Sequence, residues 1–362
     1  MGVTNHMKIL FSNKHRRVVI AICALLMGPA IITHAAEPQE LTFLTWSEYM
    51  DPELIKQFEE QYNAKVKFVY FESDELRDDM LLSTDGQGYD VICSNGRSIK
   101  TYSRQGWLTP ITEQDVPNKK HILPRWGEAF PDAKEYAVPY FWGTMGIAYR
   151  KDLVKTPITS WKQLLNPAPE LQGKMTMIKD ARDMMAVALK SEGQSINTTD
   201  MKALYEAETL LLAQKPHVKN YSYISLTKES ALLKGDVLAA LIYSGDALML
   251  ADQDENITYV VPDEGTNIWI DYLLVSKTSR KKKLAMDLIN FLNEPKNAAQ
   301  LAQYVFYATP NRAAEKLLSK DFLNDPVIYP KQLIIDNSEF YEELAPRVQK
   351  RYNGILPLLV ED

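Results

Sequence analysis

The hydrophobic and polar positions from residue 41 onward alternate between the period of a strand and the period of a helix. Residues 41–46 alternate as a half-buried strand does, and Asp51-Pro52-Glu53 supplies an N-cap with proline at the first helical position. The pattern then predicts a helix through residue 62, a strand over 65–71, a helix over 73–82 and a strand over 89–94. Strands that alternate with helices are typical of an α/β domain with a mainly parallel sheet.

A second α/β pattern follows a long extended segment. Residues 136–149 are apolar with two glycines, which predicts a strand that leaves the first lobe. After it the sequence predicts a helix beginning at Ser160-Trp161, helices over 180–190 and 199–214, and strands over 174–178 and 237–243. A strand around Trp269 and an amphipathic helix over 281–292 then resume the first pattern.

Two α/β lobes that the chain crosses more than once predict a cleft with a hinge. The predicted first lobe contains residues 37–145 and about 262–320, and the second contains residues 146–261 and about 321–362. Ligands of parallel α/β sheets bind at the carboxyl ends of the strands, which is where residues 46–49 and Ser94 fall.

The first 36 residues have the pattern of a secretory signal peptide. Four basic residues precede an apolar run over 18–32, which small residues close at Thr33, Ala35 and Ala36. The run is short, contains Pro29 and is followed at once by polar residues, so a retained membrane anchor is the weaker alternative. We therefore expect export to the periplasm.

The charge of the chain favours a cationic ligand over nucleic acid. Of 41 Lys and Arg, four lie in the leader, which leaves 37 against 47 Asp and Glu, and 37 − 47 = −10. No basic stripe follows the sequence, so we expect no nucleic-acid partner. Composition is ordinary for a globular protein, with 46% hydrophobic and 24% charged residues.

Cysteine and histidine are scarce. After the leader only Cys93, His121 and His217 remain, so the mature chain can form no internal disulfide. A histidine-based metal site or a catalytic triad has almost no material, and we predict neither a cofactor nor a metal.

Trp269 and Asp271 lie two positions apart on a predicted strand and therefore point to the same side. An aromatic face beside a carboxylate offers an amine both a π surface and a counter-charge. The alternative is core packing beside a solvated edge. Asp180 and Asp183 pose the same choice, because two acids three apart at a helix start can hold a cation or can simply cap the helix.

Eight motifs in order resemble the periplasmic polyamine-binding proteins of bacterial spermidine and putrescine uptake, over residues 41 to about 341. They are Trp46-Ser47-Glu48-Tyr49, Tyr89-Asp90-Val91 before Ser94, Val138-Pro139-Tyr140-Phe141-Trp142-Gly143, Ser160-Trp161, Asp180-Ala181-Arg182-Asp183, Tyr243-Ser244-Gly245-Asp246, the Trp269 segment, and Tyr307-Ala308-Thr309-Pro310-Asn311. The resemblance implies a class II periplasmic binding protein fold that closes over a linear polyamine, with no enzymatic activity.

By match of motif, the resemblance implies a box of aromatic and acidic residues around the ligand. Aromatic rings would pack the methylenes, and carboxylates would pair with the ammonium groups. The implied ligand-binding residues are Trp46, Ser47, Glu48, Tyr49, Ser94, Asp180, Asp183, Tyr243, Asp246, Trp269, Asp271, Tyr307 and Tyr341.

The chain departs from the family pattern at several of these positions. Asn95-Gly96-Arg97 follows the serine where spermidine-type members carry an aromatic residue, and Tyr341 stands where a glutamine is usual. Tyr243 replaces a tryptophan, Asp183 replaces a glutamate, and Asp246 matches the putrescine-type members. These differences favour a changed amine spacing, as in norspermidine. The resemblance implies a membrane partner, either an ABC permease or a signalling receptor that controls biofilm formation, and we expect a monomer.

Two other functions stay open. An exported hydrolase would use paired carboxylates such as Asp180 and Asp183, but helical spacing places them side by side instead of across a scissile bond. A binder of the same fold could take iron, a sugar or an anion. A metal ion would find too few His and Cys ligands in this sequence. An anion would need Arg or Lys at the cleft positions, which carry acids instead.

Overall fold

The sheet of this protein is built from nine strands in the order β2-β1-β3-β9-β4-β7-β5-β6, with β8 paired to β4. The computed structural model describes residues 37–360, and the predicted signal peptide lies outside the described residues. The strands are β1 (Gln39–Trp46), β2 (Ala64–Phe71), β3 (Val91–Asn95), β4 (Ala137–Arg150), β5 (Met175–Met177), β6 (Val218–Tyr221), β7 (Ala239–Tyr243), β8 (Ile257–Val260) and β9 (Ile268–Val275).

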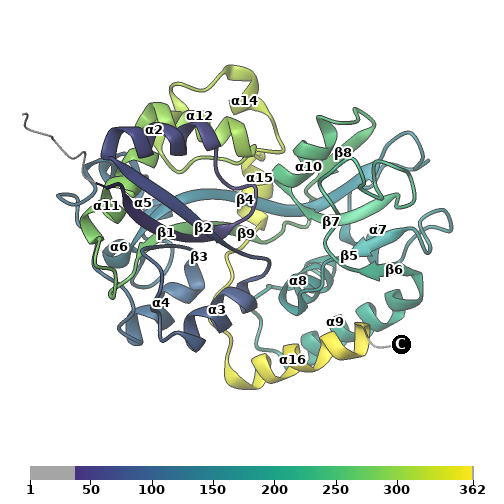
Figure 1. Cartoon of the computed structure of the whole chain (residues 1–362). Coiled ribbons are helices and arrows are strands. Elements are labelled where there is room, and N and C mark those ends of the chain that lie inside the picture. Colours follow the sequence, from purple (N-terminus) through teal and green to yellow (C-terminus); the bar gives the residue numbers. More distant parts are fainter. Residues whose placement is uncertain (1–36, 361–362) are drawn as a thin grey trace, which may run out of the picture. The chain divides into compact units, whose positions relative to one another are not determined.

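Helices connect and cover these strands (Figure 1). They are α2 (Pro52–Tyr62), α3 (Asp74–Ser83), α4 (Gly96–Arg104), α5 (Pro124–Gly127), α6 (Ala133–Tyr136), α7 (Trp161–Leu165), α8 (Ala181–Ser191), α9 (Met201–Gln214), α10 (Ser244–Ala251), α11 (Lys282–Leu292), α12 (Pro295–Val305), α13 (Arg312–Glu315), α14 (Lys320–Asn324), α15 (Gln332–Asn337) and α16 (Pro346–Val360), with the 3-10 turns η1 (Pro117–His121) and η2 (Lys215–His217).

The outer strands of the sheet form two groups, β2-β1-β3 in its first half and β7-β5-β6 in its second half. The predicted parallel pairing is confirmed within both groups. β1 pairs in parallel with β2 and β3, and β5 pairs in parallel with β6 and β7. β9 and β4 instead run antiparallel to each other and to their other neighbours. A mainly parallel sheet therefore describes the outer strands, whereas the two central strands carry the chain out of the first half and back into it.

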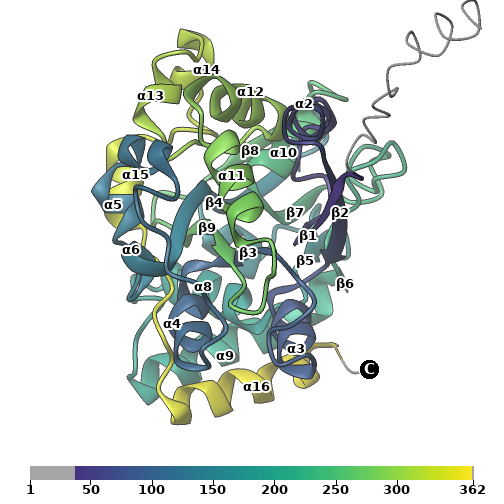
Figure 2. The same ribbon diagram turned by 60° about the vertical axis from the view of Figure 1, so that its left-hand side comes forward.

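Each half has apolar clusters on both faces of its strands. In the first half, α2, α11 and α12 cover the face that carries Phe43, Cys93 and Leu273 (Figures 1 and 2). α4, α5 and α6 cover the opposite face, around Trp142 and Tyr272. This alternation follows from the two-residue period of a strand, which sends neighbouring side chains to opposite faces.

The second half repeats the same layering. α7, α8, α9 and α16 enclose one face of β4, β5 and β7, and α10 covers the other. The helix α16 lies beside α8 and α9 in both views (Figures 1 and 2).

The C-terminal segment contacts both halves in turn. Ile328 is buried in the first half's cluster, with Phe340 packed against it, whereas Val348 is buried in the second half's cluster. The segment between residues 328 and 348 therefore passes from one cluster to the other. The lobe boundaries themselves remain a prediction.

Candidate functional site

Five aromatic rings from separate segments form one continuous wall. Tyr307 packs edge-on against Tyr49 and Trp269, with ring centroids 5.9 and 4.7 Å apart. Trp269 in turn packs edge-on against Tyr243 at 6.1 Å, and Tyr243 stacks on Tyr223 at 5.9 Å. Four of these residues were predicted for the site, and Tyr223 was not.

Two glycines permit this wall by leaving room for its rings. A Cβ on Gly143 would lie 2.6 Å from the Trp269 indole, and one on Gly245 would lie 2.6 Å from the Tyr307 ring. Both distances are far below contact distance, so a larger residue at either position would force a ring to move.

Asp183 is held between two tyrosines at the start of α8. Tyr243 donates a hydrogen bond of 2.8 Å to Oδ2, and Tyr341 donates one of 2.7 Å to Oδ1. Burial raises the pKa of this carboxyl, and the two hydroxyls oppose that increase. The structure thus brings together three of the residues predicted for the site, Asp183, Tyr243 and Tyr341.

Asp180 caps α8. Its Oδ1 accepts hydrogen bonds from the backbone N–H groups of Arg182 at 2.7 Å and Asp183 at 3.0 Å. Burial and the charge of Asp183 raise the pKa of Asp180 to about 6. Capping and cation binding are compatible here, because a capping carboxylate keeps its second oxygen available.

Asp246 lies in the first turn of α10 and is also held by two tyrosines. Tyr307 donates to Oδ1 at 3.0 Å, and Tyr223 donates to Oδ2. Burial raises the pKa of Asp246, while both hydroxyls lower it. Among residues 37–360, Asp246 forms no ion pair.

Asp271 is the most isolated acid of the group. Its side chain is buried on β9, and within the described part of the chain it makes no ion pair. Burial raises its pKa to about 7 and the charge of Asp74 adds to this, whereas Arg77 and the side chains of Tyr49 and Trp46 oppose it. A buried carboxylate without a cation is costly unless a partner arrives.

Three predicted residues lie apart from this group. Ser47 and Glu48 are exposed in the turn after β1, where Glu48 has a φ of 54°. Ser94 is buried and opposes Tyr272 in the β3–β9 ladder, so its side chain leaves the sheet on the face opposite to Asp271. The structure brings the other ten predicted residues to the aromatic wall and its acids.

The family model for bacterial extracellular solute-binding proteins matches residues 53–329. The chain belongs to this family. This solute-binding protein is 31% identical over 334 residues to the spermidine/putrescine-binding periplasmic protein of Escherichia coli strain K12, covering 92% of this chain and 94% of that protein. It is 29% identical over 314 residues to the norspermidine sensor of Vibrio cholerae, covering 86% of each chain.

A solved structure is similar as well. The spermidine/putrescine ABC transporter substrate-binding protein from Streptococcus pneumoniae, in complex with calcium and HEPES, superimposes with a TM-score of 0.77 at 29% identity, over 88% of this chain and 97% of that one. These matches confirm the predicted resemblance and the predicted fold.

Sequence reasoning missed a cluster of charges in this solute-binding protein, at the start of α3. Arg77 is fully buried and forms ion pairs with Asp74 and Asp78. Asp74 also accepts a hydrogen bond from Asn95, which opposes Asp271 in the β3–β9 ladder. The helix-start acid Asp74 resembled an ordinary first-turn residue, so only the fold reveals that it lies close to the site.

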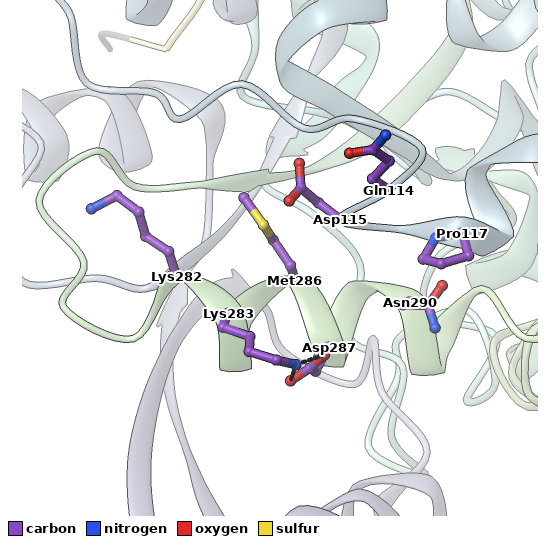
Figure 3. Close-up of a pocket in the computed structure, with 8 residues that line it drawn as sticks. All are labelled: Gln114, Asp115, Pro117, Lys282, Lys283, Met286, Asp287 and Asn290. Atoms are coloured by element: carbon purple, nitrogen blue, oxygen red, sulfur yellow. Dashed lines mark hydrogen bonds and ion pairs between the residues drawn. The ribbon is translucent and has the colours of Figure 1, made fainter.

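A surface groove lies away from the residues predicted for the site. It has a volume of about 520 Å³ and is formed by α11 and the segment before η1 (Figure 3). Its lining residues are Gln114, Asp115, Pro117, Lys282, Lys283, Met286, Asp287 and Asn290, none of which was predicted for the site. Lys283 pairs with Asp287 within the groove, so this surface already satisfies part of its own charge.

Residues 37–360 contain no group of three or more His, Cys, Asp or Glu side chains able to hold a metal ion. That part of the chain also has no helix long and apolar enough to cross a membrane. Cys93 is buried and free.

Proposed function

We propose that this protein is a periplasmic polyamine-binding protein that captures a linear, spermidine- or norspermidine-like polyamine by closure of its two lobes. The observation that carries the proposal is the set of buried acids beside the aromatic wall. Asp246 and Asp271 form no ion pair in the described chain, although both lie against aromatic rings. Ammonium groups would supply the missing charge.

The arrangement favours an unbranched chain of methylenes between ammonium groups. The edges and faces of Trp269, Tyr307 and Tyr243 present apolar area, and the electron-rich faces also attract cations. A sugar would find few free hydroxyl partners here, because the tyrosine hydroxyls already donate to Asp183 and Asp246. An anion would be repelled by the same acids.

The relatives support the cellular setting of the proposal. The name of the Escherichia coli relative places that protein in the periplasm, and the names of the other two describe a sensor and a component of an ABC transporter. We therefore propose that the closed, ligand-bound form docks on a membrane partner, as a permease component or as a sensor subunit. The protein acts without catalysis, as a monomer and without nucleic acid.

Calorimetric titration of the mature chain with putrescine, norspermidine and spermidine tests the proposal. We expect saturable binding with one ligand per chain for at least one amine, and no binding of 1,4-butanediol, which has a similar length without charge. Binding of the diol would contradict the proposal, and so would the absence of binding by every amine. Products released from a polysaccharide panel would instead favour the hydrolase alternative.

The variant Asp271→Asn tests the site. Removing one partner of a buried charge pair costs about 2 kcal/mol or more, so affinity should fall by about 30-fold or more. Asp287→Asn is the matched control, because this acid lies in the groove of Figure 3 and pairs with Lys283. Equal affinities in the two variants would show that Asp271 does not contribute to ligand binding.

A further inference from the structure

The hydroxyl of Tyr223 connects two parts of the site. Its oxygen accepts a hydrogen bond of 3.2 Å from the backbone N–H of Tyr243, and its single proton is donated to Oδ2 of Asp246. Tyr307, from the first half's cluster, donates to the other oxygen of Asp246 at 3.0 Å. Both oxygens of this carboxylate are therefore held, one by a tyrosine of the first half and one by Tyr223, which follows β6 in the second half.

The ring of Tyr223 is the exposed end of the aromatic wall. It stacks on the ring of Tyr243 at an interplanar angle of 29°, and it is 38% exposed, whereas Tyr49 and Tyr307 are buried. Tyr243 in turn donates to Asp183 at 2.8 Å. Tyr223 is thus bonded to one acid of the second half and packed against the tyrosine that holds another.

The segment that carries Tyr223 is attached to α10, the helix of Asp246. The next residue, Ile224, is buried in the apolar cluster that α10 covers. The backbone carbonyl of Leu226 accepts a hydrogen bond of 2.9 Å from the side chain of Gln253, which lies just after α10. These contacts keep Tyr223 in a fixed position relative to Asp246.

The same hydroxyl has a local role at the start of α10. Tyr243 is the N-cap residue of this helix, and Asp246 is its third residue. In a capping box, the side chain at this third position reaches back to the N-cap N–H. Here the Tyr223 hydroxyl stands between the two groups and connects them. A purely structural role for Tyr223, as part of this cap, is therefore the alternative to a role in ligand selection.

We propose that Tyr223 is a specificity-determining residue, which fixes the separation between the carboxylates of Asp183 and Asp246 and thereby the spacing of nitrogens that the site accepts. This inference rests on the proposed polyamine function and refines it. Neither carboxylate can turn toward a shorter or longer chain without losing a tyrosine hydrogen bond. The connected residues are, in order, Tyr341, Asp183, Tyr243, Tyr223, Asp246 and Tyr307.

Calorimetry with two series of amines tests this inference. One series contains unbranched diamines of three to six carbons, and the other contains norspermidine, spermidine and homospermidine, so that each step adds one methylene. In the series that the wild type binds more tightly, we expect one member to exceed its neighbours by about tenfold, because a misfit of one methylene costs about that factor.

The variant Tyr223→Phe keeps the ring and its stack on Tyr243 but removes the hydroxyl. One oxygen of Asp246 is then free, and the carboxylate can turn to meet neighbouring chain lengths. The ratio between the best amine and its neighbours should therefore shrink to about threefold or less. A cap that acts only on the stability of α10 would instead change the affinities of all amines by one common factor and leave this ratio unchanged.

Tyr221→Phe is the matched control, because it makes the same change two residues earlier and the Tyr221 hydroxyl forms no hydrogen bond within residues 37–360. It should keep the wild-type ratio, and thermal unfolding establishes that each variant is folded. An unchanged ratio in Tyr223→Phe, an equal loss of preference in Tyr221→Phe, or a wild type without length preference would overturn the inference and leave polyamine binding intact. Absence of binding by every amine in the wild type would overturn the proposed function and the inference together.

Discussion

Asp271 shows how one residue can link burial to pH. Its pKa is raised from 3.8 to about 7, chiefly by burial, so the folded protein holds this proton more tightly than the unfolded chain does. Stability must then fall as pH rises from about 4 to about 7, because the unfolded state gives up the proton first. Below this window both states are protonated, and above it the full cost of the buried charge is present.

We therefore expect the ligand-free wild type to lose stability relative to Asp271→Asn as pH rises through this window. Urea unfolding of both proteins at pH 5 and pH 8 measures the effect as a difference of differences, which cancels the contributions of the other titrating groups. The free energy of unfolding of the variant, relative to that of the wild type, should be higher at pH 8 than at pH 5. A constant difference between the two proteins at both pH values would show that Asp271 keeps its ordinary pKa.

At the scale of single elements, variants of Asp180 test whether its side chain stabilises α8 by capping the start of the helix. Replacing an N-cap side chain by alanine costs about 1 kcal/mol, whereas serine retains an acceptor. Asp180→Ser should therefore be more stable than Asp180→Ala by about 1 kcal/mol in urea unfolding at pH 7. Comparing the two neutral variants removes the effect of the charge, whose pKa burial and Asp183 raise. Equal stabilities would mean that the 2.7 and 3.0 Å hydrogen bonds contribute nothing.

The elements themselves were largely readable from the sequence. Periodicity and capping, which are local, predict α2 with its Asp51 cap, the helix start at Ser160, and the strands β1, β2 and β9. The antiparallel pairing of β4 with β9 was not predicted, because strand direction depends on contacts between distant segments.

The site divides in the same way. Trp269 and Asp271 share a face because they share a strand, and a sequence shows that directly. Tyr223 lies in a segment without clear periodicity, and its bond to Asp246 exists only because the chain folds back. Ser94 was misplaced for the same kind of reason, since its face depends on the register with Tyr272.

At the scale of the whole molecule, the acids that we propose bind the ligand are divided between the two halves of the sheet. Asp271 belongs to β9 in the first half, whereas Asp180, Asp183 and Asp246 belong to helices that follow strands of the second half. One hydrogen bond already joins the halves, from Tyr307 in the first half's cluster to Asp246. A cation that contacts acids of both halves must stabilise their approach, because it binds the closed arrangement better than the open one.

We expect saturating putrescine to reduce the radius of gyration of the mature chain in small-angle X-ray scattering. At a free ligand concentration 100-fold above Kd, the free energy of unfolding should also rise by about 2.7 kcal/mol. Asp271→Asn leaves the second half's acids in place but removes the first half's charge. If its affinity is about 30-fold lower, the same putrescine concentration is only about threefold above its Kd, so the rise in its free energy of unfolding should shrink to about 0.9 kcal/mol and its decrease in radius should be smaller. An unchanged radius in a wild type that calorimetry shows to be saturated would mean that the amine binds without closure, and the division of acids between the halves would then have no mechanical role.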